Sequence, residues 1–128
     1  MTWSDQTKKL AWAISKAEGF GTPGAIPTTA NNPGDLTFAD GFPTEGRANS
    51  EGVLKFVNLA DGWQALYHQC DLMLSGKSKV YHLTDTLADV AIKYAHDPNW
   101  GVNVAAALGV PVTTTLAELN EITESEAT

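Results

Sequence analysis

One carboxylate stands where a helical pattern near the start of the chain is about to end. The segment AISKAEGFG, residues 13 to 21, places Glu18 at the edge of an apolar stripe that carries Leu10 and Ile14. The glycines that follow let other backbone come close, which would partly desolvate the carboxyl group and raise its pKa. A carboxyl group that keeps its proton near neutral pH can protonate the leaving oxygen of a glycosidic bond. The other interpretation, a solvated glutamate in a last helical turn, stays open at this point.

A second candidate site follows in the segment TTANNPGDLTF, residues 28 to 38. Asn31, Asn32, Pro33 and Gly34 form a strong turn signal directly before a β-prone run. Asparagine amides both donate and accept hydrogen bonds, which suits sugar hydroxyls and N-acetyl groups. Turn statistics alone favour a structural role for the same residues.

A second catalytic carboxylate is not singled out by spacing. The available candidates are Asp35, Asp40, Glu45 and Asp61. Among the aromatic residues, those at helical spacing are expected to be mostly core: Trp63, Tyr67, Tyr94 and Trp100. Tyr81 and Trp100 also flank turns, so either could reach a sugar.

Other chemistries find little support in the chain. His68, His82 and His96 are fourteen residues apart each time, which matches no local metal-ligand spacing, so we expect no metal and no cofactor. There is no GxSxG nucleophile motif, and the single Cys70 falls on an expected core face, where it can form no internal disulfide.

Length and charge narrow the class of protein. The chain has 128 residues, about one domain, and a formal charge of -7, which opposes binding to nucleic acid. No apolar run approaches the roughly 20 residues that span a membrane, and no secretory signal pattern precedes the first helix. We therefore expect no nucleic-acid or membrane partner, and delivery by release or by another apparatus to any target outside the cell. The chain is also expected to be a monomer, although nothing in its composition bears on that.

Several elements would have to position Glu18. The first helix is expected to begin after Ser4 or Asp5 and to end at Gly19. From residue 19 to residue 52 the chain holds seven of its eleven glycines and four of its six prolines, so we predict a loop-rich lobe in which helix is improbable. Within it, residues 35–39 and 53–57 are predicted to pair as a small hairpin.

The rest of the chain has a helical pattern. From Ala60 onward an apolar face is expected, and its members are Trp63, Leu66, Tyr67, Cys70, Met73 and Leu74. After a connector at 76–83, Thr84 is predicted to cap the next helix, and a turn at 97–101 leads into a helix that ends at Gly109. TLAE at 115–118 predicts a capping box for a last helix, which we expect to pack from Leu116 to Ile122. Residues 120–128 form an acidic tail, for which disorder or a junction to a partner stays open as an alternative.

The order of these features resembles a known superfamily. AISKAEGFG, IPTTANNPGDL, LKFVNLADGWQALYHQCDLMLSGKSKVY, TLADVAIKYAHDPN and VAAALGV together resemble the lysozyme-like superfamily, in its branch of lytic transglycosylase-like and phage-associated muramidase domains. The likeness covers about residues 8 to 119. It implies one α+β, mostly helical domain over residues 1–119, with a small hairpin lobe and a cleft between the lobes.

The resemblance also implies roles for single residues. Glu18 matches the general acid of that branch, and residues 31–34 match a loop that borders its substrate cleft. Gly62, Trp63, Ala65 and Leu66 match its scaffold helix. The chain departs from the pattern at Asp35, where asparagine is common, and at Thr37, where a basic residue often stands. Either departure could alter substrate contacts or weaken activity.

The expected function is cleavage of the β-1,4 bond between N-acetylmuramic acid and N-acetylglucosamine in peptidoglycan strands. Glu18 would act as general acid and base, and the expected substrate contacts are Asn31, Asn32, Asp35, Tyr81, Tyr94 and Trp100. The lack of an obvious second carboxylate favours a lytic transglycosylase over a muramidase, although Asp35 or Asp40 could lie across the cleft. The alternative is a wall-binding or structural module without catalysis, from a phage particle or a secretion apparatus.

Overall fold

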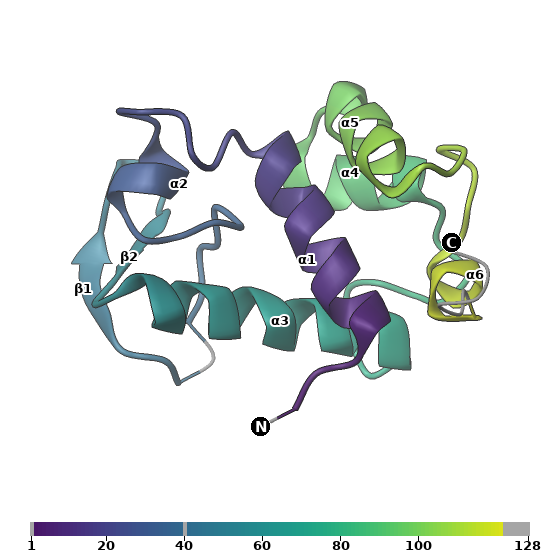
Figure 1. The fold of residues 1–128 in the computed structure, drawn as a ribbon, viewed down its shortest axis with the longest axis horizontal. Helices are drawn as coiled ribbons and strands as arrows, with labels where there is room; N and C mark the ends of the chain where they lie inside the picture. Colours follow the sequence, from purple (N-terminus) through teal and green to yellow (C-terminus); the bar gives the residue numbers. More distant parts are fainter. Residues whose placement is uncertain (1, 40, 122–128) are drawn as a thin grey trace.

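The arrangement of helices and strands is known from a computed structural model, which describes residues 2–39 and 41–121. About half of these residues are helical and one small antiparallel sheet accompanies the helices, so the fold class is α+β. Figure 1 shows α3 running beneath α1, with α2 and the two strands toward one end and α4, α5 and α6 toward the other. Asp40 and residues 122–128 lie outside the described residues, and with them two expectations, Asp40 as a second carboxylate and the end of the last helix at Ile122.

The first helix, α1 (Asp5–Ala17), begins where the sequence predicts. The Ser4 side chain accepts a hydrogen bond from the Thr7 main-chain N–H at 3.1 Å and so caps the helix. Leu10 and Ile14 are buried on the face that packs against α3 and α5. Glu18 is the C-cap residue of the helix, and Gly19 then takes a φ of 81°, which glycine adopts without steric cost.

The predicted hairpin forms, but with a different first strand. β2 (Leu54–Phe56) lies inside the predicted run 53–57, whereas its partner is β1 (Thr44–Arg47) and not residues 35–39. Asp35 has a φ of 53°, which is incompatible with a strand at that point. The run 35–39 nevertheless touches β2, because the Leu54 N–H donates to the Leu36 carbonyl at 2.9 Å.

The loop-rich lobe also contains a helix that the sequence did not predict. α2 (Ile26–Thr29) is a single turn with Pro27 in its first positions, where the missing N–H of proline costs no helical hydrogen bond. The expectation that helix is improbable here was wrong for these four residues. The high glycine content remains consistent with the turns on both sides of α2.

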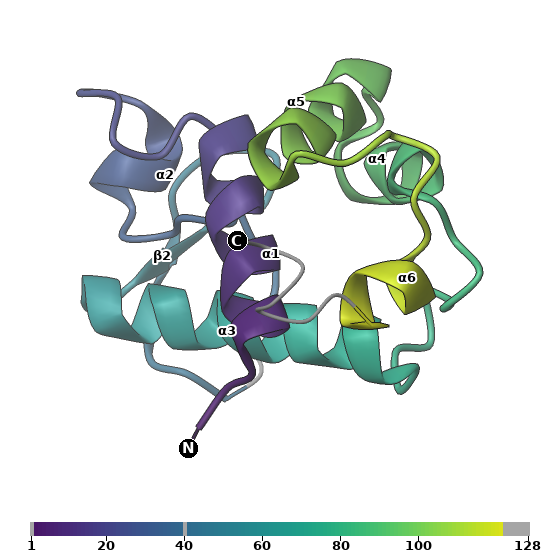
Figure 2. The same ribbon diagram turned by 45° about the vertical axis from the view of Figure 1, so that its right-hand side comes forward.

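The long helix α3 (Leu59–Ser75) runs beneath the other elements, from the end with α2 and the strands to the end with α4, α5 and α6. Asn58 caps it by accepting from the Asp61 N–H at 2.9 Å, and Gly76 ends it with a φ of 78°. Leu66, Cys70 and Met73 are completely buried, as the apolar pattern predicts. Figure 2, turned by 45°, shows α1 crossing over this helix.

In the last three helices one predicted cap was wrong, and two predicted boundaries are confirmed. α4 (Leu87–Ala95) is capped by Thr86 and not by Thr84, because Thr86 and Asp89 form a reciprocal capping box. α5 (Pro98–Leu108) ends at Gly109 as predicted. α6 (Leu116–Glu121) begins with the predicted Thr115–Glu118 capping box and buries two leucines, Leu116 and Leu119. No helix in the described ranges is long and apolar enough to cross a membrane.

Candidate active site around Glu18

Glu18 is held at the junction of α1 and α5. The indole N–H of Trp100 donates a hydrogen bond to Glu18 Oε2 at 2.8 Å, across 82 positions of sequence. Trp100 belongs to the first turn of α5 and is only 4 % exposed. Because α1 packs on α5, a buried aromatic side chain fixes one carboxylate oxygen of a residue that remains partly accessible.

The surroundings of Glu18 favour its protonated form. Burial, and next the negative charge of Asp35, raise the pKa of Glu18, whereas the Trp100 hydrogen bond lowers it, and the net result is a pKa of about 7. Desolvation is the largest of these effects. A carboxyl group with a pKa near 7 exchanges its proton near neutral pH, which is what a general acid needs.

Asp35 is the second carboxylate of the site. Its main-chain N–H donates to the Asn32 carbonyl at 3.0 Å, and its left-handed φ of 53° follows from the tight turn at residues 31–34. Burial raises the pKa of Asp35, and the charge of Glu51 adds to this. The charge of Asp35, in the loop after α2, also acts on Glu18 at the end of α1.

Tyr94 connects the turn to Trp100. Its ring stacks on the Trp100 ring with centroids 4.7 Å apart and an interplanar angle of 22°. Its hydroxyl group donates to the Gly34 carbonyl at 2.6 Å. Burial, and next the charge of Glu18, raise the pKa of Tyr94, so its hydroxyl keeps its proton and donates. Tyr94 thus connects Gly34, the residue before Asp35, to Trp100, which binds Glu18.

The side chains of the two asparagines in the turn form hydrogen bonds with main-chain groups. The Asn32 side chain is fully buried: its amide nitrogen donates to the carbonyls of Leu36 and Leu54 at 2.9 and 2.8 Å, and its oxygen accepts from the Leu36 N–H. Asn31 donates to the Phe56 carbonyl at 3.2 Å. These contacts give both residues a structural role in the turn, and both amide hydrogens of Asn32 are already used.

The third predicted aromatic contact, Tyr81, lies in an open pocket beside this group. The pocket has a volume of about 510 Å³, and its lining includes Asp35, Tyr81 and Tyr94 but not Glu18. Tyr81 and Tyr94 have ring centroids 6.4 Å apart. The structure therefore joins Glu18, Trp100 and Tyr94 by direct contacts. Asp35 acts on Glu18 through its charge, and Tyr81 shares the pocket with Asp35 and Tyr94.

The remaining carboxylate candidates lie elsewhere. Glu45 is in β1 and pairs with Lys55 at 3.5 Å, and Asp61 is in the first turn of α3. Neither contributes to the pKa of Glu18. Over residues 2–39 and 41–121, no group of three or more His, Cys, Asp or Glu residues could hold a metal ion.

The basic residues around the pocket, Lys77, Lys79 and Lys93, were not among the predicted site residues. A signal existed for the first two, since they are close together in a connector on an otherwise acidic chain.

Comparison of the chain with protein-family models, with curated proteins and with solved structures found no match. The chemistry of the site must therefore be inferred from its own geometry.

Proposed function

We propose that this chain is a peptidoglycan-cleaving glycosidase with a lysozyme-like fold, in which Glu18 is the general acid. The observation that supports this most is the environment of Glu18, whose pKa is raised to about 7 while Trp100 fixes one of its oxygens at 2.8 Å. The substrate bond is the β-1,4 linkage between N-acetylmuramic acid and N-acetylglucosamine. The resemblance of the sequence motifs to lytic transglycosylase-like domains points to this substrate.

The proposed mechanism begins with proton transfer. Glu18 gives its proton to the glycosidic oxygen while the bond from that oxygen to the anomeric carbon breaks. The resulting Glu18 carboxylate then takes a proton from the group that attacks the anomeric carbon. In a lytic transglycosylase this group is the 6-hydroxyl of the same sugar, and in a muramidase it is a water molecule.

Asp35 bears on the choice between these two branches. A transglycosylase needs one acid, whereas a muramidase usually uses a second carboxylate. The charge of Asp35 acts on Glu18, so Asp35 is a candidate for that second group and favours the hydrolytic branch. Over residues 2–39 and 41–121, no carboxylate other than Asp35 acts on Glu18, and the transglycosylase remains the branch that requires the fewest groups.

A wall-binding module without catalysis is the second candidate function. It is favoured by one observation, that the pocket of about 510 Å³ is not lined by Glu18. A sugar bound only in that pocket would not contact the proposed acid.

Mass spectrometry of the soluble products from purified peptidoglycan distinguishes these functions. We expect the protein to release fragments. Anhydro ends on them would identify a lytic transglycosylase, and reducing ends a muramidase. Binding without any fragment release, over several wall types and pH values, would refute the catalytic proposal in favour of the wall-binding module.

A further inference from the structure

The pocket beside Glu18 has features of a binding site in its own right. It lies between residues 35–38, the second half of α3, the connector at 77–81 and the end of α4. Much of its lining is apolar, from Leu36, Phe38, Leu72 and Val80. Phe38 and Val80 are 43 % and 55 % exposed, so apolar surface is available to a ligand.

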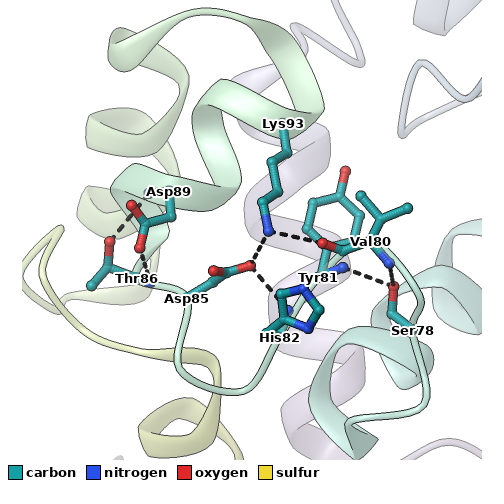
Figure 3. A network of polar contacts seen from close by, with 8 residues as sticks. All are labelled: Ser78, Val80, Tyr81, His82, Asp85, Thr86, Asp89 and Lys93. Atoms are coloured by element: carbon teal, nitrogen blue, oxygen red, sulfur yellow. Dashed lines mark hydrogen bonds and ion pairs between the residues drawn. The ribbon is translucent and has the colours of Figure 1, made fainter.

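One wall of the pocket is held in place by a polar network, shown in Figure 3. Lys93 Nζ donates to the Val80 carbonyl at 2.8 Å and pairs with Asp85 Oδ2 at 2.7 Å. The Ser78 hydroxyl oxygen accepts from the main-chain N–H groups of Val80 and Tyr81 at 3.1 and 3.0 Å. The connector is therefore fixed against α4 before any ligand binds.

The wall formed by residues 35–38 is fixed in a similar way. The Arg47 guanidinium donates to the carbonyls of Thr37 and Gly52, each at 2.6 Å. A basic side chain thus braces a main-chain carbonyl on each of two walls of the pocket. A ligand would meet a shape that is already formed, which lowers the entropic cost of binding.

The charge around the pocket is opposite to that of the whole chain. Three of the eight basic residues line it, namely Lys77, Lys79 and Lys93, although the chain carries a formal charge of -7. Asp85 compensates Lys93, whereas Lys77 and Lys79 are exposed. Among the described residues that line the pocket, Asp35 is the one carboxylate. Two exposed ammonium groups beside an apolar floor suit a ligand with carboxylates and small apolar groups.

We propose that this pocket binds the acidic stem peptide carried by the muramic acid of peptidoglycan. The peptide combines alanine methyl groups, for the apolar floor, with free carboxylates, for Lys77 and Lys79. The pocket adjoins the Glu18 site, because Asp35 lines it and acts on Glu18, and Tyr94 lines it and stacks on Trp100. This inference rests on the proposed function and adds that the enzyme selects peptide-bearing strands.

A binding experiment tests the pocket without requiring activity. The probe is the synthetic N-acetylated tetrapeptide Ala-γ-D-Glu-diaminopimelate-D-Ala, titrated into the protein by calorimetry, with its amidated form as the ligand control. We expect the Lys77→Gln/Lys79→Gln variant to bind about five- to tenfold more weakly than the wild type, since two exposed charge pairs are lost. The Lys8→Gln/Lys9→Gln variant is the matched control, because it removes two adjacent exposed lysines from α1, and it should bind like the wild type.

Equal affinity of the Lys77→Gln/Lys79→Gln variant and the wild type would overturn the proposal, as would equal binding of the amidated peptide. Circular dichroism checks that each variant is folded.

A second measurement separates this proposal from the proposed function. The rate of cleavage is compared on strands with stem peptides and on strands from which an amidase has removed them. We expect the wild type to prefer peptide-bearing strands, and the Lys77→Gln/Lys79→Gln variant to lose most of that preference. Equal rates on both strands would refute the peptide site and leave the glycosidase standing. Peptide binding that depends on the lysines, with no cleavage of either strand, would support the site and refute the glycosidase.

Discussion

At the scale of single residues, two groups act on the Glu18 carboxyl in opposite directions. The charge of Asp35 raises its pKa and the indole N–H of Trp100 lowers it, while burial is the largest single cause of the rise to about 7. A general acid must hold its proton, so activity should fall as the pH rises through this pKa. The position of that alkaline limb therefore reports on both neighbours.

Substitution of the two neighbours should move the alkaline limb in opposite directions. Asp35→Asn removes a negative charge and should shift the limb to lower pH, and asparagine tolerates the left-handed φ of 53°. Trp100→Phe removes the hydrogen bond to Glu18 and should shift the limb to higher pH. The measurement is the pH dependence of kcat/KM for fragment release. Shifts of the same sign, or none, would contradict the assignment of Glu18 as the titrating acid.

At the scale of elements, the turn at residues 31–34 decides the geometry of the site. It is held by the Asn32 amide on one side and by the close approach of α3 on the other. A Cβ atom at Gly62 would lie 1.9 Å from the Asn31 carbonyl oxygen. A side chain larger than hydrogen at position 62 would therefore displace the turn, and Asp35 with it.

Gly62→Ala should destabilise the protein by about 1–3 kcal/mol, because the added methyl group meets main chain that cannot rotate away. It should also reduce activity, through the displaced turn. Chemical denaturation measures the first effect and fragment release the second. Ala60→Ser, at an exposed position of the same helix, is the control and should change stability by less than about 0.5 kcal/mol. A Gly62→Ala protein as stable as the wild type would show that the turn does not pack on α3 as described.

The cap of α4 gives a paired test of two nearby threonines. Thr86→Ala removes the side chain that accepts from the Asp89 N–H and should cost about 1 kcal/mol of stability. Thr84→Ala, at an exposed residue outside the helix, should cost much less. Thermal unfolding of both variants checks this. A larger loss of stability for Thr84→Ala than for Thr86→Ala would indicate that Thr84 caps α4, as the sequence pattern predicts.

Local signals in the sequence were sufficient for some of these elements and not for others. The caps at Ser4 and Thr115 are set by side chains three residues from the N–H groups they bind, so a pattern search finds them. The strand at 44–47 was missed because Asn32 binds the main chain of Leu54, 22 residues away, and Asp35 has a positive φ. The contact of Trp100 with Glu18 is equally invisible in the sequence, since it depends on how α1 packs against α5.

At the scale of the whole molecule, the raised pKa of Glu18 lowers the free energy of unfolding by an amount that depends on pH. The pKa of Glu18 is about 7 in the folded protein and 4.5 without the influence of the fold. Between these values the unfolded chain has lost its proton while the folded protein keeps it. The folded state therefore binds more protons, and stability falls as the pH rises through this window.

Glu18→Gln should abolish this part of the pH dependence. Glutamine does not titrate and its carbonyl can still accept from the Trp100 indole. Relative to the wild type, the variant should gain stability between pH values of about 4.5 and 8. Free energies of unfolding from denaturant titrations at both pH values measure the difference. A difference that stays constant, or that favours the wild type at the higher pH, would contradict the raised pKa.

The most direct test of the proposed function is the rate at which Glu18→Gln releases soluble fragments from purified peptidoglycan. Because the general acid is lost, the variant should release fragments about a hundredfold to ten thousandfold more slowly than the wild type. Circular dichroism should show that the variant keeps its fold. Glu121→Gln, which alters an exposed carboxylate on α6, is the matched control and should keep the wild-type rate. Fragment release by Glu18→Gln at the wild-type rate would contradict the assignment of Glu18 as the catalytic acid.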